Sequence, residues 1–170
     1  MARGGRPPVW AILGTIAFVC VVPGTVVVAV PWWISGWRLG PPFLGTNLMR
    51  VAGMLLVVAA SPLFAAFVAR FVVEGHGTPA PIAPTRHLVV GGPFRWTRNP
   101  GYIAVVAMLV GQGLVLGSVG VLVYAALVAV AFHLFVVFYE EPTLRRTFGA
   151  EFEDYCRRVP RWVPRRPHAE

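Results

Sequence analysis

Long apolar runs separated by short polar segments dominate the chain. The four main runs are Val9–Val30, Leu48–Val73, Ile103–Leu116 and Val119–Tyr139. A helix needs about 20 predominantly apolar residues to cross roughly 30 Å of hydrocarbon. The pattern therefore predicts an all-α fold, an integral membrane helical bundle of about four transmembrane helices.

Proline and glycine mark where these helices are expected to bend or turn. Pro23-Gly24 predicts a kink in the first helix, and Gly111-Gln112-Gly113 predicts a break in the third. Gly117-Ser118 leaves room only for a tight reversal, so the last two runs are predicted to form a helical hairpin. Three tryptophans within residues 31–37 are typical of a membrane–water boundary.

The composition agrees with a membrane protein. The hydrophobic fraction is 56% and the charged fraction only 13%, whereas soluble domains are about a quarter charged. The net charge of +8 comes from arginine alone. Only Arg38 and Arg50 fall near the first connection between helices, so the positive-inside rule predicts that both termini are cytoplasmic. In this setting basic charge indicates membrane topology, and no nucleic-acid partner is predicted.

The two cysteines do not suggest a structural site. Cys20 lies in an apolar run and Cys156 in the tail, so their spacing predicts neither a disulfide framework nor a metal site. Cys156 is not at a prenylation position.

The most distinctive polar segment is the loop from Gly91 to Tyr102. Its glycines permit backbone angles that a side chain would forbid, and Pro93 and Pro100 fix the backbone locally. Such a rigid cationic loop at the start of an apolar helix suits the binding of a small charged molecule. An ordinary interfacial loop is the alternative.

Two further segments flank the apolar runs. Glu74–Thr85 is rich in proline and glycine, which predicts an extended linker. The segment 144–159 has apolar residues at helical spacing, which predicts a cytoplasmic amphipathic helix on the membrane or on the polar loop. Together these features predict a single domain, 1–170, with two helices in 1–73 and a binding core in 74–164.

A pair of adjacent carboxylates, Glu140 and Glu141, ends the last run. Carboxylates at the end of a membrane helix are costly unless they are paired or functional. Glu141 and Arg145 are spaced for a surface ion pair, while the functional alternative is the binding of hydroxyl or amino groups. His133 lies about two turns before Glu140, on the same face of a regular helix. It is a candidate catalytic residue, or a residue that bonds a neighbouring helix.

These motifs, taken in order, resemble the isoprenylcysteine carboxyl methyltransferase family. The matching stretches are Arg86-His87-Leu88-Val89, Gly92-Pro93-Phe94, Arg98-Asn99-Pro100-Gly101-Tyr102, Glu140-Glu141, Phe148-Gly149, Tyr155 and Val159-Pro160. Asn99-Pro100 and Tyr139–Pro142 are also similar to phospholipid methyltransferases. The resemblance covers roughly residues 75–164. The Gly77–Pro81 stretch looks like bacterial members, which implies the bacterial inner membrane.

The resemblance implies an S-adenosylmethionine-dependent methyltransferase acting on a lipophilic acceptor. Its cofactor-binding positions would be Arg86, His87, Leu88, Val89, Gly92, Phe94, Arg98, Asn99, Pro100, Gly101, Tyr102, Glu140 and Glu141. Cationic members would hold the donor's carboxylate, apolar and aromatic members its adenine, and the glutamates its ribose and ammonium groups. The oligomeric state and the methylated atom stay open.

Three positions depart from the family pattern. Arg86 replaces the histidine before Leu88-Val89, although His87 is adjacent, and Asn99 replaces a histidine that can titrate. Val136 replaces an arginine expected to hold the acceptor's carboxylate. The acceptor can therefore be a prenylcysteine-like carboxylate, a lipid amine, a lipid hydroxyl or another apolar molecule.

Two other functions fit parts of the pattern. A membrane-embedded reductase of the sterol type, using NADPH, shares a similar arrangement of helices and polar loop. A non-catalytic four-helix scaffold would use the polar loop only to cap the bundle. Saturable binding of S-adenosylmethionine or of NADPH distinguishes the enzymes from each other, and an insensitive Glu140→Ala variant would indicate the scaffold.

Overall fold

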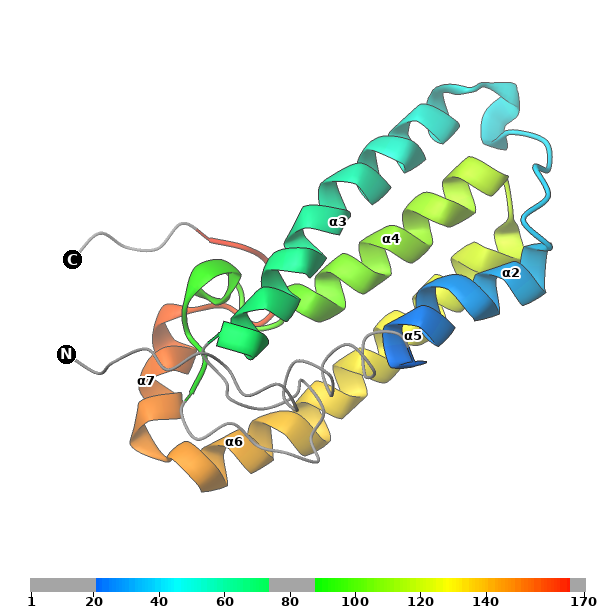
Figure 1. Cartoon of the computed structure of the whole chain (residues 1–170). Coiled ribbons are helices and arrows are strands. Elements are labelled where there is room, and N and C mark those ends of the chain that lie inside the picture. Colours follow the sequence, from blue (N-terminus) through cyan, green and yellow to red (C-terminus); the bar gives the residue numbers. More distant parts are fainter. Residues whose placement is uncertain (1–20, 74–87, 166–170) are drawn as a thin grey trace.

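A computed structural model describes residues 21–73 and 88–165, and helices and turns make up this part of the chain. Figure 1 shows α3 and α4 side by side, α2 and α5 along the opposite side of the bundle, and α6 and α7 at one end beside the polar loop. The elements are η1 (Thr25–Ala29), α2 (Val30–Ser35), η2 (Phe43–Gly45), α3 (Leu48–Val73), η3 (Gly92–Arg95), α4 (Pro100–Leu116), α5 (Val119–Phe135), η4 (Val136–Glu140), α6 (Glu141–Phe148) and α7 (Ala150–Arg158). The predicted linker, Glu74–Thr85, lies outside the described residues.

Helix α4 is continuous, so the predicted break at Gly111–Gly113 is wrong. The glycines instead allow helices to pack closely. A Cβ atom on Gly53 of α3 would lie 2.6 Å from the carbonyl oxygen of Gly111, and one on Gly113 would lie 2.5 Å from Cδ2 of Leu122. Either distance is far below van der Waals contact. Small residues at helix crossings are a general feature of membrane bundles, where close backbone approach stabilises packing.

The hairpin between α4 and α5 is confirmed. Gly117 caps α4 in the left-handed region, with φ of 64°, a conformation that glycine adopts readily. Ser118 caps α5, and its hydroxyl oxygen accepts a hydrogen bond from the backbone N–H of Val121 at 3.3 Å. The α4 and α5 ends far from this turn therefore lie together, at the end where the polar loop begins.

Two turns of π-helix, η1 and η4, interrupt otherwise regular helices, and each is followed two residues later by a proline, Pro31 or Pro142. A proline inside a helix lacks the N–H that the carbonyl four residues earlier requires, and its ring clashes with that carbonyl. Widening the preceding turn relieves the clash, and such turns are frequent at functional sites. The first helix is thus irregular immediately after Pro23-Gly24, but it continues to Ser35, beyond the predicted end at Val30.

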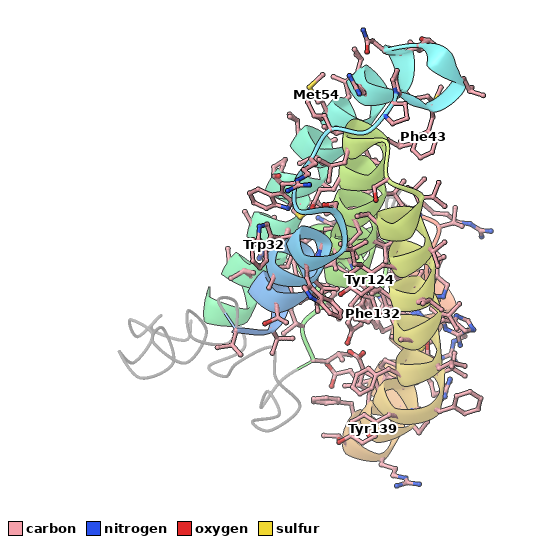
Figure 2. All side chains as sticks on the ribbon, turned by 90° about the vertical axis from the view of Figure 1, so that its right-hand side faces the viewer. Trp32, Phe43, Met54, Tyr124, Phe132 and Tyr139 are labelled. Atoms are coloured by element: carbon pink, nitrogen blue, oxygen red, sulfur yellow. The ribbon has the colours of Figure 1, made fainter. Side chains whose placement is uncertain are left out.

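The carbonyls released by Pro31 find partners on the other helices. Tyr124 of α5 donates its hydroxyl hydrogen to the Val26 carbonyl at 3.2 Å, and Gln112 of α4 donates its amide to the Val27 carbonyl at 3.0 Å. These bonds fix the first helix against the hairpin. Figure 2 shows Tyr124 and Phe132 on the side of α5 that faces the bundle, where both pack against the core of Val105, Leu109 and Ala125.

The sequence predicted that the last apolar helix ends at the acidic pair. The helix instead continues beyond Glu140. It runs from Val119 through η4 into α6 and ends at Phe148. Gly149, with φ of 52°, then separates α6 from α7. The single amphipathic tail helix predicted over 144–159 is therefore two short helices, because a positive φ interrupts a helix of L-residues.

Within residues 21–73 and 88–165, two helical stretches, Leu48–Arg70 and Val119–Phe148, are long and apolar enough to cross a membrane. Only 11% and 17% of their most apolar windows are buried inside the structure, whereas the core helix of a soluble protein would be largely covered. Val21–Ser35 and Pro100–Leu116 are shorter apolar helices. Trp33 in α2 is 82% exposed, as expected of an aromatic residue that faces lipid.

Candidate functional site

The polar loop and the acidic pair are in direct contact, as predicted. The hydroxyl of Tyr102, at the start of α4, donates a hydrogen bond to Oε2 of Glu140 at 2.9 Å. Arg98 of the loop approaches Glu141, with 3.0 Å between Nη1 and Oε1. The hairpin brings the two segments together, because α4 begins at the end of the bundle where α5 gives way to η4. The η4 turn then directs the adjacent carboxylates toward different partners.

Glu141 is the centre of a buried ion cluster. Its side chain is only 5% exposed, and both of its oxygens accept hydrogen bonds from Arg161, at 2.7 and 2.9 Å. Arg145 adds the predicted i,i+4 pair at 3.5 Å. A buried carboxylate is stable only when its charge is compensated. Here three arginines compensate it, so the carboxylate of Glu141 is already occupied by the protein itself.

Glu140 has a different environment. It is half-buried, and within the part of the chain that the structure describes, Tyr102 is the group that hydrogen-bonds to it. An ionised carboxylate can accept about four hydrogen bonds, so Glu140 retains acceptor capacity. The ring of Tyr102 packs against Phe132, with 4.6 Å between the ring centroids. This contact fixes the direction of the tyrosine hydroxyl and, through it, of the carboxylate.

The segment Val159–Arg165, which we call the C-terminal strap, runs beside the polar loop. The backbone N–H of Arg98 donates to the Pro160 carbonyl at 2.9 Å, and the N–H of Arg165 donates to the Trp96 carbonyl at 3.0 Å. Side chains of the loop, Thr97 and Asn99, add bonds to the carbonyl of Arg161 at 3.0 and 3.1 Å. The strap therefore has a fixed register on the loop.

Asn99 and Arg98 thus hold the strap and the ion cluster, besides being predicted cofactor ligands. The amide of Asn99 is buried and donates to the strap. Nη1 of Arg98 also lies 2.7 Å from the sulfur of Cys156, to which it donates. Burial raises the pKa of the Cys156 thiol, and the charge of Arg98 opposes this rise. The direct binding of a cofactor by these two residues stays a prediction.

Two further predicted residues, Phe94 and Leu88, shape the site through packing. Phe94 is buried against Phe67 of α3, with 6.0 Å between ring centroids, and its carbonyl accepts a bond from the Tyr155 hydroxyl at 2.8 Å. Leu88 packs against the buried residues Phe152, Tyr155 and Val159. Burial raises the pKa of Tyr155, which keeps its hydroxyl protonated as a donor.

Three predicted positions are explained by backbone geometry or close contact. Gly92 has φ of 56°, and a Cβ atom there would lie 2.5 Å from Nε of Arg70. Gly101 faces the ring of Phe67, which a Cβ atom would approach to 2.7 Å. Pro100 is buried at the first position of α4, where a missing N–H costs nothing. Val89 is buried, and Arg86 and His87 lie outside the described residues.

His133 lies in a separate, apolar part of the site. A groove of about 420 Å³ extends along α3, α4 and α5, lined by apolar residues together with Tyr102, His133 and Trp162. Nδ1 of His133 accepts a hydrogen bond from Nε1 of Trp162 at 3.2 Å. The widened turn η4 shifts the helical register between His133 and Glu140. Tyr102 links the two regions, since its ring lines the groove and its hydroxyl bonds Glu140.

Thr97, Arg161 and Trp162 were not predicted from the sequence. Pro160 and Pro164 exclude a helix across 160–164, so an extended segment with an arginine and a tryptophan was a signal for a strap that contacts the site. Thr97 lies between predicted ligands of the loop, but a single small polar residue gives no signal of its own in the sequence. Within the described residues, no cluster of three histidine, cysteine, aspartate or glutamate side chains can hold a metal ion.

The model of the phospholipid methyltransferase family matches residues 48–151, more than half of the chain. The chain belongs to the phospholipid methyltransferase family. The match includes α3, the polar loop, the hairpin and the acidic pair, whereas the C-terminal strap lies beyond the matched residues. The methyltransferase assignment replaces the reductase and scaffold alternatives.

Curated relatives of the methyltransferase are distant. Protein-S-isoprenylcysteine O-methyltransferase B of Arabidopsis thaliana is 27% identical over 154 residues, which are 91% of this chain and 70% of the relative. Nickel-cobalt-cadmium resistance protein NccN of Alcaligenes xylosoxydans xylosoxydans is 38% identical over 81 residues, which are 46% of this chain and 36% of that protein. No solved structure matches the chain significantly.

Proposed function

We propose that the protein transfers a methyl group from S-adenosylmethionine to a lipophilic amine that enters from the bilayer. One observation supports this proposal most strongly: Tyr102 connects an apolar groove to the carboxylate of Glu140 through a hydrogen bond of 2.9 Å. A lipophilic substrate and a polar donor need adjoining compartments of this kind, because the reacting atoms have to meet in a dry site.

The donor is proposed to bind on the Glu140 side of Tyr102. Bound S-adenosylmethionine supplies a methyl group on a positively charged sulfur, which retains the bonding electrons when the methyl group leaves. The free acceptor capacity of Glu140 fits the donor's ammonium or ribose hydroxyls. Arg86 and His87 remain the proposed ligands of its carboxylate on the strength of the family resemblance. Glu141, Arg98 and Asn99 are proposed to position this compartment.

The groove favours an acceptor with an uncharged reacting group. The position where prenylcysteine enzymes are expected to have an arginine is Val136, which is 1% exposed. The nearby Arg98 and Arg161 are both engaged with Glu141. Among the described residues, the lining of the groove contains no arginine to compensate a carboxylate, which would therefore enter at a high desolvation cost. The name of the Arabidopsis relative, an isoprenylcysteine O-methyltransferase, thus does not transfer directly to this chain.

An amine fits the same groove better. Removal from water disfavours the charged form of an amine and lowers its pKa, so an apolar groove enriches the neutral form whose lone pair is nucleophilic. The nitrogen forms a bond to the methyl group as the sulfur–carbon bond breaks, and the new ammonium afterwards releases a proton to water. No base has to act during the transfer. In this proposal His133 is a residue of the groove wall.

The proposed topology has four membrane helices, of which the first includes Val21–Ser35 and the others are α3, α4 and α5. Helices α6 and α7 would lie on the cytoplasmic side with both termini, because exposed arginines such as Arg146, Arg157 and Arg158 gather there. We propose that 1–170 form one domain. Single cysteines placed at Leu44 and Arg157 in a cysteine-free background should be labelled by an impermeant reagent from opposite sides of sealed vesicles.

The proposed reaction is tested by tritium transfer from methyl-labelled S-adenosylmethionine into a total lipid extract. The expected product is a labelled lipid amine whose tritium resists mild alkali. Label that mild alkali releases would indicate a methyl ester and so a carboxylate acceptor. The Glu140→Gln variant gives the background level of tritium in the lipids. If the wild type labels no lipid above this background, the result would contradict the proposed activity.

A further inference from the structure

One wall of the groove does not come from the helices that form the rest of it. Leu56 belongs to α3, Val106 and Val110 to α4, and Phe132 to α5, whereas Trp162 belongs to the C-terminal strap. Along α4 the lining extends from Tyr102 to Val110, about 12 Å at 1.5 Å per residue. The polar side chains of the lining, those of Tyr102, His133 and Trp162, lie at the end of the hairpin far from its turn.

The position of Trp162 is fixed by its neighbour. The carbonyl of Arg161 accepts hydrogen bonds from Thr97 and Asn99 at 3.0 and 3.1 Å. The guanidinium group of Arg161 makes a bidentate contact with the buried carboxylate of Glu141. Paired bonds of this type fix orientation as well as distance. Arg161 therefore faces the ion cluster, while Trp162 faces the groove. The indole is presented by a rigid support.

The hydrogen bond to His133 fixes the indole further. Nδ1 of His133 accepts from Nε1 of Trp162 at 3.2 Å, and the centroids of the two rings lie 6.0 Å apart. Because the indole N–H can only donate, this bond sets the orientation of the indole at the end of the groove.

We propose that Trp162 is a specificity-determining residue for the acceptor. This inference rests on the proposed function of the groove. The indole, held between the strap and His133, closes the polar end of the groove and limits the bulk of the head group that can reach Tyr102. Unbranched chains with a compact head, such as a primary amine, pass this point. A head that already has several methyl groups is excluded.

The test uses two photoreactive probes that share one linear alkyl chain with a terminal diazirine. One probe has a primary amine head and the other a trimethylammonium head. The protein is placed in lipid nanodiscs, and labelling of peptides from α4 and α5 is quantified by mass spectrometry. The variants are Trp162→Ala, and Trp162→Phe in case the first does not fold. Trp96→Phe is the matched control, because Trp96 lies in the polar loop and its backbone carbonyl, which the change leaves in place, accepts the bond from Arg165 of the strap.

In the wild type and in Trp96→Phe, labelling by the amine probe should be about tenfold stronger than labelling by the trimethylammonium probe. This ratio is the lower end of the selectivity that an apolar pocket achieves against a ligand with extra methyl or methylene groups. Trp162→Ala should bring the ratio close to one, and Trp162→Phe should lower it. A structural role alone would reduce labelling by both probes equally and leave the ratio unchanged, which would overturn the proposal. A wild type without preference would also overturn it.

Binding of S-adenosylmethionine, measured on the same samples by calorimetric titration, separates this proposal from the proposed function. If the wild type does not bind S-adenosylmethionine, the methyltransferase mechanism fails, while the labelling ratio still decides whether Trp162 selects head groups. Trp162→Phe should keep the affinity of the wild type for S-adenosylmethionine, since the bond that it removes lies on the groove side of Tyr102.

Discussion

The hydroxyl of Tyr102 donates a hydrogen bond of 2.9 Å to the Glu140 carboxylate, and this contact joins the first turn of α4 to the turn η4. The two residues are far apart in sequence but share one end of the hairpin. Tyr102 also lines the apolar groove. The bond therefore marks the boundary between the proposed donor compartment and the proposed acceptor compartment.

Replacement of the Tyr102 hydroxyl should weaken donor binding without unfolding the protein. Hydrogen bonds to charged groups contribute about 1.5–3 kcal/mol. Tyr102→Phe is therefore expected to lower the affinity for S-adenosylmethionine about tenfold, because Glu140 loses the group that orients it. Tyr124→Phe makes the same chemical change at a hydroxyl that bonds Val26 instead, and it should leave the affinity unchanged. Equal effects of the two changes would contradict a specific role for Tyr102.

Glu141 should matter mainly for stability. Removing one partner of a buried ion pair leaves uncompensated charge and costs about 3–5 kcal/mol. Glu141→Gln is expected to lower the free energy of unfolding in detergent by at least about 3 kcal/mol. Glu153 pairs with Arg145 in an exposed position, so Glu153→Gln should cost less than about 1 kcal/mol. A similar cost for both changes would mean that the Glu141 cluster is solvated.

The bond from Thr97 to the strap should control local opening. Thr97→Val removes a hydroxyl that donates to the Arg161 carbonyl, and a neutral hydrogen bond contributes about 1 kcal/mol. Hydrogen exchange at the backbone amides of Arg98 and Arg165, which bridge loop and strap, should accelerate about fivefold. Thr147→Val removes an exposed bond within a helix and should not change exchange at these two amides. Unchanged exchange in Thr97→Val would show that the strap is held by other contacts.

Cys156 should react slowly with alkylating reagents. Burial raises the pKa of its thiol, only partly offset by the nearby charge of Arg98, and the thiolate is the reactive form. At a pH near the pKa of an ordinary thiol, the ionised fraction of the Cys156 thiol is therefore smaller than that of a free cysteine. In a Cys20→Ser background, iodoacetamide should modify the folded protein more slowly than the denatured one, with a rate that rises toward higher pH. Faster modification of the folded protein would contradict the raised pKa.

The sequence predicted the main helices well because hydrophobic patterning determines them. The bounds of α3 match the predicted run Leu48–Val73, and Gly117-Ser118 produced the expected hairpin. The break predicted at the glycines of α4 is wrong. Their low helix propensity predicts a break, but contact with Gly53 and Leu122 requires residues without side chains and overrides that propensity.

The turns η1 and η4 were not predicted, although Pro31 and Pro142 are visible in the sequence. A proline predicts a helix end unless other groups serve the carbonyls that it releases. Tyr124 and Gln112 do so for the first turn, and such partners depend on tertiary packing. The break between α6 and α7 was not predicted for a similar reason. A glycine such as Gly149 is compatible with a continuous helix, and its positive φ is known only from the structure.

The candidate site was predicted in outline. Contact between the polar loop and the acidic pair followed from topology and is confirmed by the bonds of Tyr102 and Arg98. The different roles of the two glutamates did not follow, because Arg161 reaches Glu141 only through the register of the strap. The pairing of His133 with Trp162 depends on the same register.

We propose above that Glu140 belongs to a binding site for S-adenosylmethionine at the boundary set by Tyr102. The most direct measurement is calorimetric titration of S-adenosylmethionine into the wild type, Glu140→Gln and Glu153→Gln in detergent. We expect saturable binding to the wild type and to Glu153→Gln, and an affinity at least about tenfold lower for folded Glu140→Gln. Equal affinity of all three proteins would contradict it.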